Sequence, residues 1–465
     1  MTHTTCSLKS RINLKTGYPN VQLLPVDLIR ESANKVLSNP SIAHPALLYG
    51  PDPGDLRCRK AIATWLGLFY RPTHAIPESR ICITGGASQS LGLMLSVYTD
   101  PEYTLNVWIV APAYFLAFRI FQDEGFGDKL RAVPEDEQGI DIQYLRREMS
   151  KRQEQAQKDG VTQPKYKGDR RGAKVYRHVV YCVPTFGNPS SRSWTLRRRQ
   201  ELVKLAREFD ALVVSDDVYD RLQWRRQEGH VAGDASLARA QLPRLVDIDG
   251  EMDGGAERAG ADGFGNTVSN GSFSKIAGPG MRIGWVEGTD KFSYGVSQAG
   301  IQASGGAPSQ LTSTYMAEML GSGQLDHHIA TVLQPAYSSR YFKVMTAIKS
   351  ELVPLGFGIP QADGEMAGGY FTWLSLPEGI TATALEAQCR DEENVIVAPG
   401  NIFEVPTDNQ GALSFGDHIR VCWSWEDASM LGEAIKRIAA VTKRMLDDDY
   451  VVVDDGRVKD RTYRV

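Results

Sequence analysis

The sequence lacks the marks of secreted, membrane-spanning and metal-binding proteins. Its first residues contain no apolar run typical of a secretory signal, and no stretch approaches the roughly 18 apolar residues of a transmembrane helix. The six cysteines are scattered, with no CxxC pair and no histidine cluster, which argues against a disulfide framework and a zinc site. We therefore expect a cytoplasmic protein with no metal centre.

An excess of charge of one sign is also missing. The formal net charge is −4, which gives no electrostatic reason to expect nucleic acid or an anionic membrane as a partner. Hydrophobic residues make up 42% and charged residues 23%, as in ordinary globular proteins. With 465 residues, the chain is long enough for about two domains, each with a core of its own.

Short apolar runs alternate with helical patterns along most of the chain. This alternation predicts an α/β fold whose large domain has a mostly parallel sheet between helices. Thr195 is expected to cap a helix whose apolar residues recur at i, i+3, i+4 and i+7 from Leu202. The expected strands of the sheet are residues 80–84, 105–110, 178–183, 211–215, 267–271 and 282–286.

The rest of the chain predicts a second, smaller α+β domain. After about residue 305 the pattern turns helical, and strands follow at 370–376 and 418–423. The expected division is an N-terminal arm that is part of the small domain (1–45), the large domain (46–305) and the small C-terminal domain (306–465).

Three polar stretches interrupt the pattern. Residues 151–174 are interpreted as a solvated connection before a strand. Residues 227–266 are expected to form a long surface loop, with an active-site lid as the alternative. The charged tail from residue 447 is expected to be frayed or docked on the surface.

The strongest local motif surrounds Lys275. It reads Ser272-Phe273-Ser274-Lys275, followed by Gly278-Pro279-Gly280-Met281-Arg282-Ile283-Gly284. A lysine at the end of a buried strand is costly unless it is deprotonated or covalently used. Ser272 and Arg282 are suited to binding a phosphate, and the glycines permit close backbone approach. Taken alone, a surface lysine in a loop is an equally good interpretation.

Polar residues also follow two other expected strands. Asp216 and Tyr219 come after residues 211–215, and Asn188 comes after residues 178–183. Carboxyl ends of strands border the crevice where α/β proteins bind ligands. The alternatives are that Asp216 and its neighbour Asp217 cap a following helix and that Asn188 belongs to a plain turn.

The turn after the strand at 80–84 is a candidate anion site. Gly86, Ala87 and Ser88 lie where free amides at the start of a helix can bind a phosphate. Tyr114 follows the next strand. A plain glycine turn and ordinary packing are the respective alternatives.

In this order the motifs resemble the class I/II aminotransferases, fold-type-I enzymes that depend on pyridoxal 5′-phosphate (PLP). The nearest branch in appearance contains the aminoadipate, kynurenine and aromatic amino acid aminotransferases. The resemblance extends from about Gly17 to Arg420. One departure is Ser191, which stands where the family has the glycine of Asn-Pro-x-Gly and puts the geometry of that loop in question.

The resemblance implies roles around the cofactor. Lys275 would hold PLP as a Schiff base, Asp216 would pair with the pyridine nitrogen, and Tyr219 and Asn188 would bond the phenolic oxygen. The other residues implied to bind the cofactor are Gly86, Ala87, Ser88, Tyr114, Ser272 and Arg282.

The resemblance also implies a substrate clamp and a second subunit. Arg420 lies in an otherwise apolar strand and would bind the substrate carboxylate bidentately, with a structural salt bridge as the alternative. Gly17 would let the N-terminal segment close over the substrate, which Asn188 also contacts. Tyr49 would reach the phosphate of a neighbouring subunit in a homodimer with shared active sites.

The implied activity is transfer of an amino group between an α-amino acid and a 2-oxo acid by a ping-pong mechanism. An elimination, decarboxylation or biosynthetic cyclisation on the same scaffold is the alternative within PLP chemistry. A PLP-binding transcription regulator is a third hypothesis, but such a regulator needs a DNA-binding segment, and only about 16 residues precede Gly17.

Overall fold

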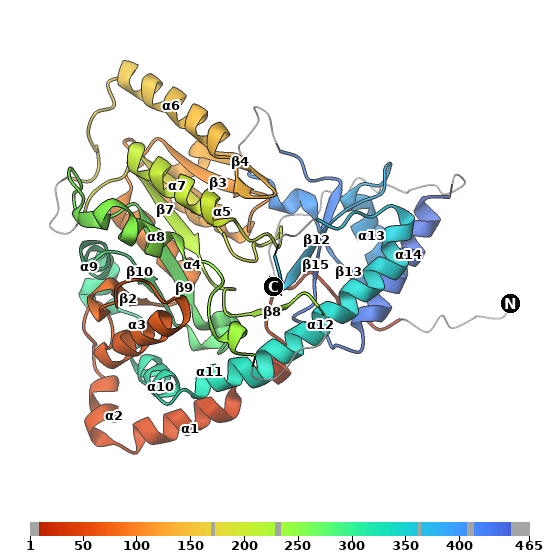
Figure 1. The fold of residues 1–465 in the computed structure, drawn as a ribbon, viewed down its shortest axis with the longest axis horizontal. Helices are drawn as coiled ribbons and strands as arrows, with labels where there is room; N and C mark the ends of the chain where they lie inside the picture. Colours follow the sequence, from red (N-terminus) through yellow and green to blue (C-terminus); the bar gives the residue numbers. More distant parts are fainter. Residues whose placement is uncertain (1–8, 169–172, 228–233, 361–363, 407–412, 448–465) are drawn as a thin grey trace.

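Helices cover both faces of a central eight-stranded sheet, and a second group of strands and helices lies beside it (Figure 1). This computed structural model describes residues 9–168, 173–227, 234–360, 364–406 and 413–447. The central strands are Ile81–Thr84 (β2), Asn106–Ala111 (β3), Leu130–Asp136 (β4), Gly139–Ile140 (β5), His178–Cys182 (β6), Ala211–Asp216 (β7), Thr267–Ser272 (β9) and Gly284–Glu287 (β10). Their order is β2-β10-β9-β7-β6-β3-β4-β5.

The middle of the sheet is parallel, as predicted. β4, β3, β6, β7 and β9 pair in parallel, whereas β10 is antiparallel to both β9 and β2. Successive side chains of β6 face opposite sides: Val179 and Tyr181 enter one apolar cluster, and Val180 and Cys182 enter the other. Because both faces are covered, such a strand reads as a continuous apolar run.

Two sets of helices complete these clusters. One face carries α4 (Ala87–Tyr98), α5 (Leu116–Phe121) and α9 (Asp290–Ser297), and the other carries α6 (Ile142–Lys158), α7 (Leu196–Glu208) and α8 (Leu245–Glu251). α7 begins where the sequence predicts, because Thr195 Oγ1 accepts a hydrogen bond from the Arg198 amide at 3.3 Å.

Smaller sheets and further helices form the rest of the structure. β12 (Phe371–Ser375), β15 (His418–Cys422) and β14 (Ala398–Pro399) make a three-stranded sheet, and β8 (Gln223–Arg225) pairs with β11 (Met366–Gly368). β1 (Ile12–Asn13) pairs in parallel with β13 (Val395–Ile396), which joins the N-terminal segment to the C-terminal part. The remaining α-helices are α1 (Val26–Leu37), α2 (Pro40–Ala46), α3 (Leu56–Tyr70), α10 (Gln310–Gly321), α11 (Gln324–His328), α12 (Gln334–Ala347), α13 (Ala382–Glu393) and α14 (Leu431–Met445).

Every predicted strand is present, with ends that shift by one or two residues. The strand expected at 282–286 begins at Gly284, because Arg282 adopts a left-handed conformation (φ 50°) after a 3-10 turn. β4 and β5 were not predicted. Within the described residues, no helix is both long and apolar enough to cross a membrane.

Two predictions about polar stretches are wrong in part. Residues 151–158 continue α6 instead of forming a solvated connection, because Met149 and Ala156 bury one side of that helix. The stretch 227–266 contains α8, which buries Leu245 and accepts a hydrogen bond from Arg207 at Asp249 Oδ1, at 2.7 Å. Residues 169–172 and 228–233 and the tail from 448 lie outside the described residues.

Candidate active site

The predicted cofactor residues lie at one edge of the central sheet. Asp216 is the last residue of β7 and Ser272 the last of β9. Lys275 ends a 3-10 turn, Phe273–Lys275, that directly follows β9. Asn188 lies in the connection after β6. Because β6, β7 and β9 are parallel, their carboxyl ends bring these side chains to the same edge.

Lys275 has the environment of a reactive amine. Its Nζ donates a hydrogen bond to the carbonyl of Gly17 at 2.9 Å and lies 5.6 Å from the centre of the Tyr370 ring. Loss of hydration lowers the pKa of Lys275 to about 8, while nearby Asp216 opposes this shift and Arg420 adds to it. The interpretation of Lys275 as an ordinary surface lysine therefore does not fit.

Asp216 is buried and only half satisfied. Its Oδ2 accepts a hydrogen bond from the hydroxyl of Tyr181 at 2.8 Å, whereas Oδ1 has no hydrogen-bond partner among the described residues. Burial, opposed by the Tyr181 hydrogen bond and helped by the charge of Asp217, raises the pKa of Asp216 to about 7. A buried carboxylate oxygen without a donor marks a place where a ligand N–H would be stabilised.

The neighbouring Asp217 does not cap a helix, so the alternative interpretation of this pair is wrong. β7 is followed by a turn, and the Asp217 carboxylate accepts hydrogen bonds from the hydroxyls of Ser215 at 2.5 Å and Ser269 at 2.6 Å. It belongs to the packing of β7 against β9, whereas Oδ1 of Asp216 stays without a donor among the described residues.

The glycine turn after β2 meets Arg282. Gly86 has φ 109°, and a Cβ added there would lie 3.0 Å from an Arg282 guanidinium nitrogen. Arg282 also donates to the carbonyl of Gly85. Ala87 and Ser88 begin α4, where the first amides have no partner within the helix. Free amides beside a guanidinium form an anion site.

Ser272 lies next to this turn through the pairing of β9 with β10. Its hydroxyl accepts a hydrogen bond from the amide of Ser274 at 3.1 Å and donates to the Ser274 hydroxyl at 2.9 Å. The structure therefore brings the predicted phosphate residues to the strand that leads to Lys275.

Arg420 is buried in β15 and has only neutral partners. It donates to Asn188 Oδ1 at 2.7 Å and to the carbonyl of Lys15, and its Nε has no partner among the described residues. Its guanidinium carbon lies 4.1 Å from the ring centre of Phe371 and 4.9 Å from that of Phe403. Within the described residues it forms no ion pair, so the structural salt bridge is not found. Its charge is suited to a ligand carboxylate.

Two tyrosines lie close to these groups. Tyr219 is buried, with its ring edge-on to Tyr370 at 5.5 Å and to Phe371 at 5.9 Å, and burial raises its pKa well above the usual value. Tyr114 follows β3, and its pKa rises to about 12 through loss of hydration and the charge of Asp216.

Gly17 and Tyr49 differ in position. Gly17 accepts the Lys275 hydrogen bond, and a Cβ added there would lie 2.8 Å from Phe371 Cζ, so no larger residue fits without movement. Tyr49 does not join the residues around Lys275, because 87% of it is exposed.

Comparison with known proteins identifies the family that carries this geometry. The sequence profile described as aminotransferase class I and II matches residues 9–438. The chain belongs to the class I and II aminotransferases. An uncharacterized protein of Saccharomyces cerevisiae is 34% identical to it and covers 93% of this chain and 97% of its own length. Aromatic-amino-acid aminotransferase 1 of Thermococcus litoralis is 26% identical and covers 93% of this chain and 88% of its own.

A solved structure supports the same conclusion. The crystal structure of kynurenine aminotransferase from Pyrococcus horikoshii, in complex with PMP, KYN as substrate and KYA as product, is similar to this aminotransferase with a TM-score of 0.73 at 25% identity. The match covers 94% of this chain and 92% of that one. The predicted family, fold and PLP-dependent aminotransferase activity are thus confirmed.

The residues of this aminotransferase fit PLP. The unpartnered Oδ1 of Asp216 offers an acceptor for a ring N–H, and the Gly86 turn with Arg282 offers donors for a phosphate. Lys275 lies on the turn after β9, and in the sheet β9 stands between β7, which ends at Asp216, and the β10–β2 pair, which leads to the Gly86 turn.

Three contributors to the aminotransferase site were missed by sequence reasoning. They are Tyr181, which bonds Asp216, and Tyr370 and Phe371, which border Lys275 and Arg420. The available signal was strand alternation, since Tyr181 is two residues from Val179 and shares its face. That pattern does not reveal which carboxylate the tyrosine meets.

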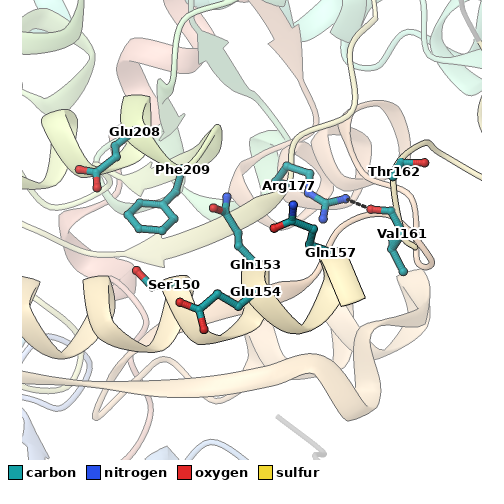
Figure 2. Close-up of a pocket in the computed structure, with 9 residues that line it drawn as sticks. All are labelled: Ser150, Gln153, Glu154, Gln157, Val161, Thr162, Arg177, Glu208 and Phe209. Atoms are coloured by element: carbon teal, nitrogen blue, oxygen red, sulfur yellow. Dashed lines mark hydrogen bonds between the residues drawn. The ribbon is translucent and has the colours of Figure 1, made fainter. Parts of the chain in front are cut away.

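A separate hollow at the opposite edge of the sheet takes no part in this site (Figure 2). It is lined by Gln153 and Gln157 of α6, by Arg177 just before β6 and by Phe209 just before β7. Arg177 is engaged in a 3.2 Å hydrogen bond to the carbonyl of Val161. Because these residues precede the parallel strands, the hollow lies away from the carboxyl ends where the site is built.

Proposed function

We propose that Lys275 carries PLP covalently and that Asp216 keeps the pyridine nitrogen protonated. The observation that carries this assignment is the buried, unpartnered Oδ1 of Asp216 near a lysine whose pKa is lowered to about 8. From the resemblance, Tyr219 and Asn188 bond the phenolic oxygen. The other cofactor residues in the proposal are Gly86, Ala87, Ser88, Tyr114, Ser272 and Arg282.

The proposed division of labour assigns proton transfer to Lys275. When bound, PLP supplies an electron sink that makes the Cα–H bond of an amino acid acidic. With the cofactor bound, Nζ of Lys275 would accept the Cα proton of the amino acid and would later donate a proton to complete the amino-group transfer. A pKa near 8 leaves part of the amine uncharged at neutral pH. A 2-oxo acid then takes up the amino group in the second half of a ping-pong cycle.

Substrate orientation is assigned to Arg420. Its guanidinium lies against Phe371 and donates to Asn188 and to the carbonyl of Lys15, so the protein directs two of its N–H groups. A carboxylate bound to it in fork geometry would hold the amino acid with its Cα proton toward Lys275. Arg11 and Lys15 of the N-terminal segment are the residues that could meet an acidic substrate side chain, and both are exposed, so the structure gives no support to a buried clamp for such a side chain.

We further propose a homodimer with shared active sites. Leu47, Leu48, Tyr49 and Ile301 are between 64% and 87% exposed, an unusual concentration of apolar surface. The Tyr49 ring packs beside Gly305, so residues 47–49 and 301–305 form one patch. A second copy of the chain is suited to cover this patch, and from the resemblance Tyr49 would then reach the partner's phosphate site.

The remaining proposals concern domains and compartment. Residues 46–305 are assigned to the cofactor domain, and residues 1–45 and 306–465 to the small domain, in line with the pairing of β1 with β13. The five described cysteines, Cys58, Cys82, Cys182, Cys389 and Cys422, are unpaired, which supports a reducing, cytoplasmic location.

A single-turnover experiment tests this function. PLP-loaded protein is mixed with L-kynurenine, L-phenylalanine or L-2-aminoadipate, and absorbance is followed without a 2-oxo acid. Conversion to the pyridoxamine form together with release of the matching 2-oxo acid supports transamination. Release of ammonia or carbon dioxide instead would establish an elimination or a decarboxylation, the alternative reactions on this scaffold.

A further inference from the structure

Ser191 occupies a backbone conformation that a serine rarely adopts. Its φ is 60°, in the left-handed region, and it stands where the family motif Asn-Pro-x-Gly has glycine. Its amide donates to the carbonyl of Gly187 at 2.7 Å, and the Gly187 amide donates to the carbonyl of Arg192 at 2.9 Å. The turn is therefore closed whichever residue stands at 191. A non-glycine residue persists in such a conformation when the surrounding contacts hold it there.

The Ser191 side chain makes a contact that glycine cannot make. Its hydroxyl donates a hydrogen bond to the backbone carbonyl of Phe371, the first residue of β12. Cys422 lies opposite Phe371 across the β12–β15 pair, but its amide donates to the carbonyl of Leu14 at 2.8 Å. The Ser191 hydroxyl thus attaches the turn that carries Asn188 to the end of β12.

Phe371 in turn contacts the substrate side of the site. Its ring is 2% exposed and lies 4.1 Å from the guanidinium carbon of Arg420. Its Cζ lies 2.8 Å from where a Cβ on Gly17 would be, and its ring meets that of Tyr219 edge-on at 5.9 Å. A shift of this ring therefore moves the surface on which the guanidinium of Arg420 rests.

We propose that Ser191 is a positioning residue for the substrate carboxylate. It fixes the backbone of Phe371, and through the Phe371 ring it fixes the plane of the Arg420 guanidinium. The Asn188–Arg420 hydrogen bond at 2.7 Å forms a second link between the same turn and β15. The inference rests on the proposed function, in which Arg420 binds the carboxylate shared by amino acids and 2-oxo acids.

Three variants separate positioning from folding. S191A removes the hydroxyl but keeps a side chain in the left-handed region, whereas S191G removes the hydroxyl and relieves that conformation. S193A is the matched control, since the Ser193 hydroxyl accepts a hydrogen bond from the Phe186 amide at 3.0 Å within the same turn and, among the described residues, forms no hydrogen bond to β12. All three are prepared with PLP bound.

The measurements are thermal unfolding, the cofactor absorbance spectrum, and calorimetric binding of 3-phenylpropanoate, a carboxylate that cannot react. Loss of one neutral hydrogen bond at the support of Arg420 is expected to weaken binding about three- to tenfold in both S191A and S191G. The melting temperature should fall in S191A and be restored or raised in S191G. S193A should bind 3-phenylpropanoate like the wild type, and all spectra should be unchanged.

Wild-type affinity in S191G, or affinities that follow melting temperature across the three variants, would overturn the inference and leave Ser191 a structural residue. A wild-type protein that binds PLP yet neither binds 3-phenylpropanoate nor converts any amino acid of the panel contradicts the proposed function itself, and the inference falls with it. If the wild type turns over normally and S191A and S191G bind 3-phenylpropanoate as tightly as the wild type, the inference about Ser191 fails while the proposed function stands.

Discussion

Replacing Arg420 by methionine tests whether its buried charge serves the substrate or the fold. Arg420 is 3% exposed, donates to Asn188 Oδ1 at 2.7 Å and forms no ion pair within the described residues. Hydrogen bonds to charged groups contribute about 1.5–3 kcal/mol each, so a two-bond clamp on a carboxylate is worth about 3–6 kcal/mol. At about 1.4 kcal/mol per decade, R420M should lower kcat/KM about 10²- to 10⁴-fold.

The same variant should hardly affect stability. Methionine removes two hydrogen bonds to neutral acceptors, but it also removes a buried charge that has no ionic partner. We expect the free energy of unfolding to change by no more than about 1 kcal/mol. R420K, which keeps the charge without the planar fork, should fall between R420M and wild type in kcat/KM. Steady-state kinetics and thermal unfolding on the same preparations decide: a large loss of stability with little loss of kcat/KM would refute the reasoning.

Three further predictions concern residues of the candidate active site. The Tyr181 hydroxyl donates a hydrogen bond that lowers the pKa of Asp216, so Y181F should raise this pKa further above its usual value. The acidic limb of the pH–kcat profile should then move to higher pH; an unmoved limb contradicts this role of Tyr181. Apoprotein should take up PLP faster as pH rises through about 8, because Lys275 reacts as the free amine, whereas a pH-independent rate would exclude this pKa. G17A places a Cβ 2.8 Å from Phe371 Cζ, and overpacking of about 1–3 kcal/mol should lower the melting temperature and raise KM; wild-type values for both would show that the segment yields freely.

The sequence was sufficient to predict how the cofactor residues are arranged. Asp216 and Asn188 each follow an apolar run typical of a buried strand, Lys275 follows the predicted strand at 267–271, and parallel strands end at a common edge. The order of strands and polar residues along the chain therefore predicted that these side chains lie at the same edge of the sheet. Thr195 and the stripe from Leu202 likewise predicted α7, because capping and periodicity are local properties.

Features that depend on contacts between distant segments could not be predicted. Tyr181 looks like any aromatic residue of a buried strand until β6 and β7 are paired and its hydroxyl meets Asp216. α8 was missed because it is seven residues long and lies in a glycine-rich stretch, where its stability comes from packing on α7 and β9 and not from its own periodicity. Ser191 appeared only as a departure from a motif, and its use became visible with Phe371 beside it.

The central claim is that Lys275 is the residue to which PLP is attached, and reduction of the PLP-loaded protein with borohydride tests it most directly. Reduction fixes the linkage, and mass spectrometry after proteolysis locates the modified peptide. The structure predicts a pyridoxyl phosphate adduct on Lys275 in the wild type and no adduct on any lysine in K275A. An adduct on another lysine, or an unmodified Lys275 in protein that has bound PLP, would contradict the account.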